Sequence, residues 1–385
     1  MATFVENIKK LDKISIIFFI VNVLLWLPFE CVALYSGELE LILLVTGTGL
    51  IIYSLIIPGL YYPVLLRAIL CFQIFVVTAL YMLASTFITW VRTPRMQILP
   101  DLLYEIIPKG NEIHIPLLGD TTIVWMVDTT LYIVSGITVI LVLSQSDRLT
   151  IIKRFCLHYT VMQVCRTICL LVTNLPDCSD LCRAIVYPLH LIIYIYKLYI
   201  LNNNTPGTTL YKDIDYITVV RNTWNTLLHP YHFVTCGDVM FSGHTTLLVS
   251  VCLIWLTYFK PRNNRILNYV NSLVYFLVIM CLFGIIKSRF HYSLDVIVAI
   301  FLTLGTWNLI HSLAYNASHG IRIKEEWIWG EFYLLEFFDW LEKPERIMFT
   351  RKLPKIPRFP NPFEFFYNKI RDPSFYDNLF KHKKE

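Results

Sequence analysis

The chain has 385 residues, of which 56% are hydrophobic and only 16% are charged, and its formal net charge is +5. A soluble globular domain carries about a quarter charged residues, so a soluble enzyme is excluded. The mean hydropathy of +0.56 and a succession of long apolar runs indicate a polytopic membrane protein. Positive charge lies in short loops and at the chain ends, which the positive-inside rule explains without a nucleic-acid partner.

Eight apolar runs are long enough to cross a bilayer as helices. They are residues 14–35, 41–57, 69–90, 123–144, 155–173, about 239–258, 270–286 and 296–313. The predicted fold class is therefore an all-α polytopic membrane protein with about eight transmembrane helices. The first run is not a signal peptide, because it is long enough to span and no small-residue cleavage site follows it.

A ninth run, residues 184–201, is interrupted by Pro188 and by the charged Lys197, and we interpret it as an interfacial or re-entrant helix. With eight spans and a cytosolic N-terminus, the basic loops 147–154 and 260–265 both fall on the cytosolic side. A ninth span would separate them. The tail after the last run also becomes cytosolic, and its aromatic clusters are expected to lie partly against lipid headgroups. Those clusters contain Trp327, Trp329, Phe337, Phe338 and Trp340.

Two polar clusters stand at the start of predicted spans, where ionisable side chains are functional candidates by default. They are residues 236–245 and 291–295. His291 and Asp295 are four residues apart and share one helix face, where the carboxylate can hold the second imidazole nitrogen. Between His244 and His291 lie one span, a basic loop and a returning span, so both histidines are expected on the same side of the membrane.

Two imidazoles on one side suit phosphoryl transfer, with one histidine as nucleophile and the other as general acid and base. Gly243 would let the backbone approach a phosphate, and the first-turn amides of the next helix can add to anion binding. Each histidine alone also fits an ordinary interfacial residue, and only the joint pattern favours catalysis. No His-Glu-x-x-His motif occurs, and a metal would need more ligands than His244, His291 and Asp295, so neither a metal nor a cofactor is expected.

Residues 236–245 and 291–296 read Cys-Gly-Asp-x-x-x-Ser-Gly-His-Thr and His-Tyr-Ser-x-Asp-Val, and they resemble two signature motifs of the sphingomyelin synthase family. This family is a branch of the lipid phosphate phosphatase superfamily. A third family motif is matched in spacing, with Lys and Gln as substitutions, by Lys153, Arg154, Gln163, Arg166 and Thr173. Leu99-Pro100-Asp101 resembles the end of a fourth, Pro-Pro-Leu-Pro-Asp, and the resemblance covers roughly residues 69–338.

The resemblance implies a ceramide cholinephosphotransferase, which moves phosphocholine from phosphatidylcholine to the primary hydroxyl of ceramide and releases diacylglycerol. It implies that His291 is the nucleophile and that Asp295 orients it. His244 would protonate the leaving oxygen and then activate the ceramide hydroxyl. The expected partners are the membrane, a phospholipid donor and ceramide, and a homo-oligomer is left open.

The resemblance also implies a domain organisation and a location. The segments are a cytosolic N-terminus at 1–13, two additional spans at 14–60, a six-span catalytic core at 66–315 and a cytosolic tail at 316–385. Chemistry on ceramide implies the Golgi or plasma membrane, with a luminal or exoplasmic active site. Cys178, Cys182 and Cys236 fall on that side, where a disulfide is permitted.

The supporting residues expected around the histidines are Arg166, Asp238, Ser242, Gly243, Tyr292 and Phe290. Arg166 would either clamp a phosphate or pair with Asp238 for stability. Phe290 stands where family members that use choline or ethanolamine have an acidic residue. Its ring could hold a quaternary ammonium or pack against lipid. The Ser288-Arg289 pair resembles an element of the phosphatases and suggests a further phosphate contact.

Three alternatives stay open at the level of sequence. The head group could be ethanolamine or inositol instead of choline. The same histidines could pass the phosphoryl group to water, as in a lipid phosphatase or a phospholipase C, because the sequence does not reveal a ceramide pocket. A channel or transporter is disfavoured, since the polar residues cluster at two span ends and do not line a pathway.

Overall fold

The computed structural model describes residues 12–60, 62–92, 99–110, 112–115, 119–173, 175–176, 178, 215–228, 239–259, 265–318 and 331–342. Within these residues the chain is a helical, multipass membrane protein with one short hairpin. Backbone groups find no partners in hydrocarbon, so each apolar run folds as a helix that satisfies them internally. The interrupted run 184–201, the predicted site residue Asp238, Cys182 and Cys236 lie outside the described residues.

Each of the eight predicted runs forms a helix. The helices are α2 (Lys13–Ser36), α3 (Leu39–Ser54), α5 (Pro63–Arg92), α7 (Ile123–Ser144), α8 (Arg148–Val172), α12 (Gly243–Tyr258), α13 (Arg265–Lys287) and α14 (Ser293–Ser318). Six described helices are long and apolar enough to cross a membrane. The other two, α3 and α12, have 16 residues each, which is about 24 Å at 1.5 Å per residue. The count of eight spans therefore stays a prediction.

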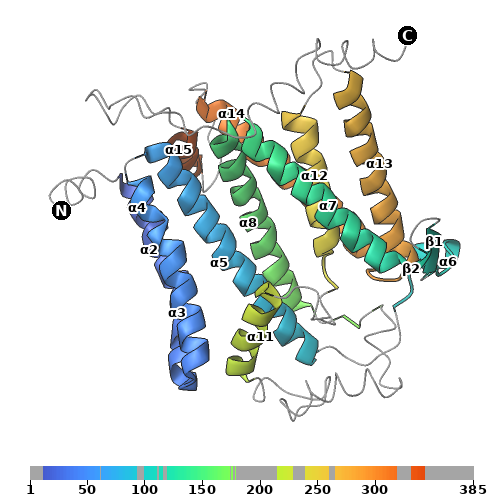
Figure 1. Cartoon of the computed structure of the whole chain (residues 1–385), viewed down its shortest axis with the longest axis horizontal. Coiled ribbons are helices and arrows are strands. Elements are labelled where there is room, and N and C mark those ends of the chain that lie inside the picture. Colours follow the sequence, from blue (N-terminus) through green and yellow to red (C-terminus); the bar gives the residue numbers. More distant parts are fainter. Residues whose placement is uncertain are drawn as a thin grey trace, which may run out of the picture.

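The inner position of α8 explains its unusual sequence. It packs against α5, α7, α12 and α14, while α2 and α3 lie at one side of the bundle and α13 at the other (Figure 1). These neighbours cover one face of α8, which can therefore carry the buried polar side chains of His158, Gln163 and Arg166. The sequence predicted that Lys153 and Arg154 lie in a loop. That prediction is wrong, because the helix begins at Arg148 and both residues lie in its second turn.

Four short elements join these helices. They are α4 (Ile56–Gly59), α6 (Leu102–Ile106), β1 (Glu112–Ile115) and β2 (Gly119–Thr122). The two strands pair antiparallel, with Glu112 opposite Thr122, and β2 leads directly into α7 (Figure 1). This hairpin is a small departure from the all-α expectation.

Two further helices cover the sides of the bundle. The first, α11 (Tyr216–Leu228), packs on α5 and α2, and the second, α15 (Glu331–Glu342), packs on α14. The prediction that the tail aromatics face lipid headgroups is wrong for Phe338 and Trp340, which are 2% and 5% exposed. Their rings pack in a core cluster with Leu66 and Leu70 of α5, because burial inside the bundle removes more apolar surface from water than interfacial anchoring does.

Candidate active site

The two predicted catalytic histidines lie next to each other. His244 is in the first turn of α12, His291 lies two residues before α14, and their ring centroids are 6.1 Å apart. Because α13 runs between these two helices and reverses the chain direction, α12 and α14 begin at the same end of the bundle. We call this the site end, and it is also where the β1–β2 hairpin lies (Figure 1).

His244 has a carboxylate partner that the sequence motifs do not contain. Its Nε2 lies 3.1 Å from Oδ1 of Asp128 in the second turn of α7, and the two side chains are 30% and 35% exposed. A carboxylate at this distance fixes the orientation of the imidazole ring. Asp128 was missed because its neighbours form no recognisable motif. The signal that could have found it is the single carboxylate within the apolar run 123–144.

His291 is buried, with only 3% of its surface exposed. Burial lowers the pKa of His291 well below its usual value of 6.5, and the nearby His244 and Arg166 lower it further. A backbone hydrogen bond to Val239 acts in the opposite direction. Nδ1 of His291 is buried and has no hydrogen-bond partner among the described residues. The ring is therefore neutral at neutral pH, which is the form that a nucleophile requires.

Asp295 lies in the first turn of α14, as predicted, and it makes two hydrogen bonds with the backbone. Its Oδ2 accepts a hydrogen bond from the amide of Tyr292 at 3.2 Å, and its carbonyl accepts from the amide of Ser242 at 3.4 Å. Asp295 thus caps its own helix and ties the starts of α12 and α14 together. It does not occupy Nδ1 of His291. The orienting role of Asp295 stays a prediction.

Ser242 and Gly243 form the beginning of α12, and Arg166 of α8 contacts this turn. The hydroxyl of Ser242 caps the helix by accepting from the amide of Thr245 at 3.2 Å. The guanidinium of Arg166 donates to the carbonyl of Phe241. A Cβ on Gly243 would lie 3.1 Å from that guanidinium, which is a tight contact, so glycine leaves room for Arg166 to approach. From the sequence, we expected Gly243 to let the backbone come close to a phosphate.

Phe290 lies against both catalytic candidates. Its ring centroid is 5.0 Å from that of His244 and 5.0 Å from that of His291, edge-on in both cases. It is also packed at the edge of the core cluster between α7, α12 and α13. Phe290 therefore shapes the site directly and is not a residue that only faces lipid.

Tyr292 and Arg289 point away from the histidines. The hydroxyl of Tyr292 donates to the carbonyl of Pro176 and accepts from the amide of Leu99, both at 3.1 Å. The guanidinium of Arg289 donates to the carbonyls of Tyr104 and Ile107. The suggestion that Arg289 contacts phosphate stays a prediction. Both side chains fasten loops to the segment that carries His291.

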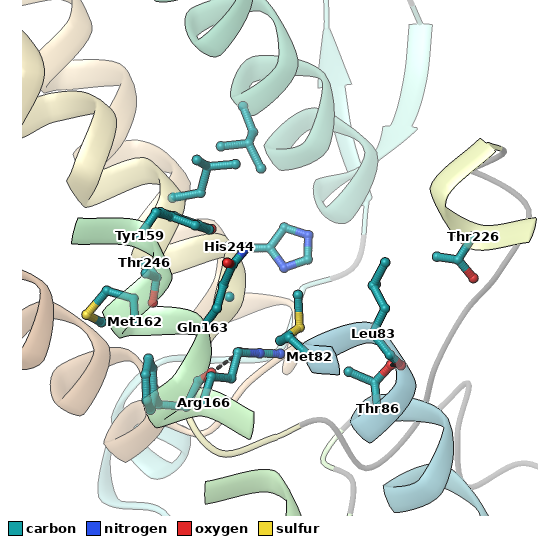
Figure 2. A pocket seen from close by; sticks show the side chains of 14 residues that line it. Met82, Leu83, Thr86, Tyr159, Met162, Gln163, Arg166, Thr226, His244 and Thr246 are labelled. Atoms are coloured by element: carbon teal, nitrogen blue, oxygen red, sulfur yellow. Dashed lines mark hydrogen bonds between the residues drawn. The ribbon is translucent and has the colours of Figure 1, made fainter. Parts of the chain in front are cut away.

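A cavity of about 250 Å³ opens beside His244 between α5, α7, α8, α11 and α12. Figure 2 shows the His244 ring and the Arg166 guanidinium at this cavity, with Met82, Leu83 and Thr86 of α5 nearby. Most of the lining surface is apolar, and the polar atoms come chiefly from Gln163, Arg166 and His244. Within the described part of the chain, no group of three or more His, Cys, Asp or Glu side chains could hold a metal ion.

Comparison with known proteins gives relatives of one kind. "Sphingomyelin synthase-related protein 1" of Mus musculus is 34% identical over 106 residues, which is 27% of this chain and 20% of the relative. A "Phosphatidylethanolamine:ceramide ethanolaminephosphotransferase" of Trypanosoma brucei brucei is 27% identical over 184 residues, which is 45% and 44% of the two chains. "Phosphatidylcholine:ceramide cholinephosphotransferase 1" of Caenorhabditis elegans is 25% identical over 295 residues, which is 71% and 52%.

These alignments span between 20% and 52% of the length of the relatives. Residues 235–312 match the family described as PAP2 superfamily C-terminal. That segment contains both histidines, the beginning of α12 and most of α14. The chain thus carries a PAP2 superfamily C-terminal segment and is a homologue of sphingomyelin synthase-related proteins and ceramide phosphotransferases.

Proposed function

We propose that this chain is a ceramide phosphotransferase that moves phosphocholine from phosphatidylcholine to the primary hydroxyl of ceramide. The observation that carries the proposal is the convergence of His244 and His291, with ring centroids 6.1 Å apart, beside the cavity that Arg166 lines. Two imidazoles at this separation can flank one phosphate group, and a guanidinium can balance its charge. The printed names of the relatives support transfer to ceramide.

In the proposed reaction His291 attacks the phosphorus, and we assign the attack to Nδ1 because this nitrogen has no hydrogen-bond partner. The bond from phosphorus to the diacylglycerol oxygen breaks, and protonated His244 gives its proton to that oxygen. The ceramide hydroxyl then attacks the phosphohistidine, His244 takes the hydroxyl proton, and the bond from phosphorus to nitrogen breaks. No water and no net proton is consumed. Asp128 orients the His244 ring, which carries the proton before the first step and again after the second.

Choline is the head group that we propose. Family members with an acidic residue before the nucleophile place a full negative charge there, whereas this chain has Phe290. An aromatic face attracts a quaternary ammonium without requiring a hydrogen bond, while a primary ammonium keeps three N–H donors that a phenyl ring leaves unsatisfied. Phe290→Glu should therefore shift the ratio of the phosphatidylcholine and phosphatidylethanolamine rates towards ethanolamine. An unchanged ratio would remove Phe290 from head-group recognition.

The location of the reaction is also a proposal. The site end is opposite the end at which α8 begins with the basic residues Lys153 and Arg154. Basic residues mark the cytosolic side. This distribution supports a luminal or exoplasmic active site, and therefore the Golgi or plasma membrane, with both termini in the cytosol.

The test is turnover by the purified full chain in mixed micelles with fluorescent ceramide. Phosphatidylcholine, phosphatidylethanolamine and phosphatidylinositol are offered in separate reactions, and the lipid products are resolved. We expect labelled sphingomyelin and an equal amount of diacylglycerol with phosphatidylcholine. Diacylglycerol released together with free phosphocholine, with no ceramide product, would instead establish a hydrolase. Product with phosphatidylethanolamine or phosphatidylinositol alone would overturn the choline assignment and leave the transferase.

A further inference from the structure

The segment that carries His291 is held by a loop that is nearly 190 residues away in sequence. The loop comprises residues 99–110 and includes α6, and it bonds to residues 288–293 at several points. Turnover requires the His291 ring to meet the phosphorus within a narrow range of positions. The ring itself has few bonds that could fix it, since Nδ1 has no hydrogen-bond partner. Its placement therefore depends on the backbone that carries it.

Asp101 makes the strongest of these contacts. Its Oδ2 accepts from the amide of Ser293 at 2.7 Å, and its Oδ1 accepts from the hydroxyl of Ser293 at 2.6 Å. Oδ1 also accepts from the amide of Leu103 at 3.0 Å and so caps α6. Ser293 is the first residue of α14, and a carboxylate at a helix N-terminus is favoured by both the free amides and the helix dipole. Asp101 thus caps two helices at once.

Tyr104 holds the residue next to this cap. Its hydroxyl donates to the carbonyl of His291 at 2.8 Å, and its ring stacks on that of Tyr292 with centroids 5.9 Å apart. The guanidinium of Arg289 also lies over the Tyr104 ring, with its Cζ 3.7 Å from the ring centroid. Arg289 has a φ of 58°, in the left-handed region that non-glycine residues avoid. This unfavourable backbone is held by the bonds from its side chain to the carbonyls of the loop.

We propose that Asp101 and Tyr104 are positioning residues for His291, and that the loop 99–110 sets the distance of the imidazole from the phosphorus. Neither side chain touches the cavity beside His244. The oxygens of Asp101 are occupied by backbone amides and a serine hydroxyl, so Asp101 takes no part in proton transfer. The loss of either residue should therefore lower kcat while the KM for both lipids stays constant. The kinetic part of this inference rests on the proposed function.

The test compares Asp101→Ala, Asp101→Asn and Tyr104→Phe in the full chain. Asp101→Ala should lower kcat about 10- to 100-fold, which is the effect of displacing a reacting group by about 1 Å. Asp101→Asn should restore part of this loss, because the amide oxygen can accept from the Ser293 amide while its NH₂ donates to the Ser293 hydroxyl. The NH₂ cannot accept from the Leu103 amide, so the cap of α6 is lost. Tyr104→Phe keeps the ring and removes the hydroxyl with its bonds to the His291 carbonyl and to Cys178. It should give a smaller loss, and it protects the test against misfolding of the alanine variant.

Hydrogen–deuterium exchange supplies a readout that does not depend on turnover. Amides 291–295 should lose protection in Asp101→Ala and regain it in Asp101→Asn, while those of α12 stay unchanged. The control is Glu38→Gln, which removes an ion pair with Arg221 at a distance from both histidines and should change neither kcat nor exchange at 291–295. Unchanged exchange at 291–295 in Asp101→Ala, or increased exchange with wild-type kcat, would overturn the proposal. Absence of turnover in the wild type would contradict only the proposed function. The exchange result at 291–295 would then decide whether Asp101 holds the segment of His291.

Discussion

The two ends of the bundle both bury polar side chains, but they use them differently. At the far end, which we define by Lys153, Arg154 and Glu342, the carboxylate of Glu342 bonds the guanidinium of Arg154 at 3.0 and 2.9 Å and lies 3.5 Å from Nζ of Lys153. His311 of α14 lies towards this end, and its Nε2 and Nδ1 bond to Tyr258 and to the carbonyl of Trp307.

At the site end, in contrast, Nδ1 of His291 has no partner among the described residues, and His244 and Asp128 are about one third exposed beside a cavity. A buried group with all its bonds made stabilises a fold, because removing a partner leaves an uncompensated charge. A buried group with a free lone pair stabilises less and can react. We therefore expect incomplete bonding next to a cavity to mark the reactive end of this protein.

The largest expected difference is between the two histidines associated with α14. His291→Ala should lower kcat by at least about 10⁴-fold, because without the nucleophile no phosphohistidine can form. His311→Gln, at the other end of the same helix, should keep kcat near the wild-type value. Both are measured by ceramide turnover in mixed micelles. Equal losses in the two variants would show that the comparison of the two ends has no functional meaning.

Glu342→Gln tests the structural end. Lys153 and Glu342 are only 5% and 6% exposed, and the substitution would leave two buried cations without a carboxylate. Breaking a buried pair in this way costs about 3–5 kcal/mol, so the midpoint of thermal unfolding should fall clearly. The kcat of the folded fraction, measured well below that midpoint, should not change. A loss of kcat without a loss of stability would move the far end into the catalytic machinery.

Asp128→Asn tests whether the partner of His244 is functional. An asparagine keeps the size of the side chain but cannot stabilise the imidazolium, so we expect kcat to fall about 10²-fold. Thermal stability should change little, because the pair is partly exposed and such pairs contribute up to about 1 kcal/mol. The opposite pattern, with wild-type kcat and a lower unfolding midpoint, would assign Asp128 to structure.

The acidic limb of the pH profile is the most delicate test. The pKa of His291 is held below 6.5 by burial and by neighbouring cations, so the neutral nucleophile persists as the pH falls below 6.5. The limb of kcat/KM should therefore lie below pH 6.5. Replacing Arg166 with glutamine removes one of these cations and should move the limb to higher pH, whatever its effect on the rate. A limb that moves to lower pH would contradict the assignment.

The same shift predicts how stability depends on pH. The unfolded chain binds a proton at His291 below pH 6.5, where the folded chain does not yet bind it. Stability should therefore fall as the pH decreases from 6.5 towards the lower folded pKa, and it should gain nothing from His291 above 6.5. Thermal unfolding of the wild type and of His291→Ala across this range measures the contribution.

The residues differ in how well the sequence predicted them. The helix positions of His244 and Asp295 follow from span boundaries, because an apolar run must be helical and its length fixes where it ends. The bonds of Asp295 were not predictable. A spacing of four residues allows contact with the ring of His291, yet the carboxylate accepts from the Tyr292 amide, which the helix N-terminus leaves without a partner.

Long-range partners were beyond the sequence for a related reason. Asp128 and His244 are on different helices, as are Glu342 and Arg154, and Asp101 meets Ser293 across most of the core. Whether two such side chains meet depends on the rotation of each helix about its axis and on which helices are neighbours. An apolar pattern in a membrane constrains that rotation weakly, since lipid and the bundle interior are both apolar.

The sequence by itself determined that this is a helical membrane protein and where its apolar helices run. It also determined that His244 and His291 lie in two motifs, each at the start of a helix. These features are local: they follow from hydrophobicity, length and the need to satisfy the backbone. Only the tertiary structure decided that Asp128 is the partner of His244, that Gly243 lies against Arg166, and that the loop with Asp101 holds the segment of His291. Those features depend on packing between distant segments, which close contact of side chains alone can specify.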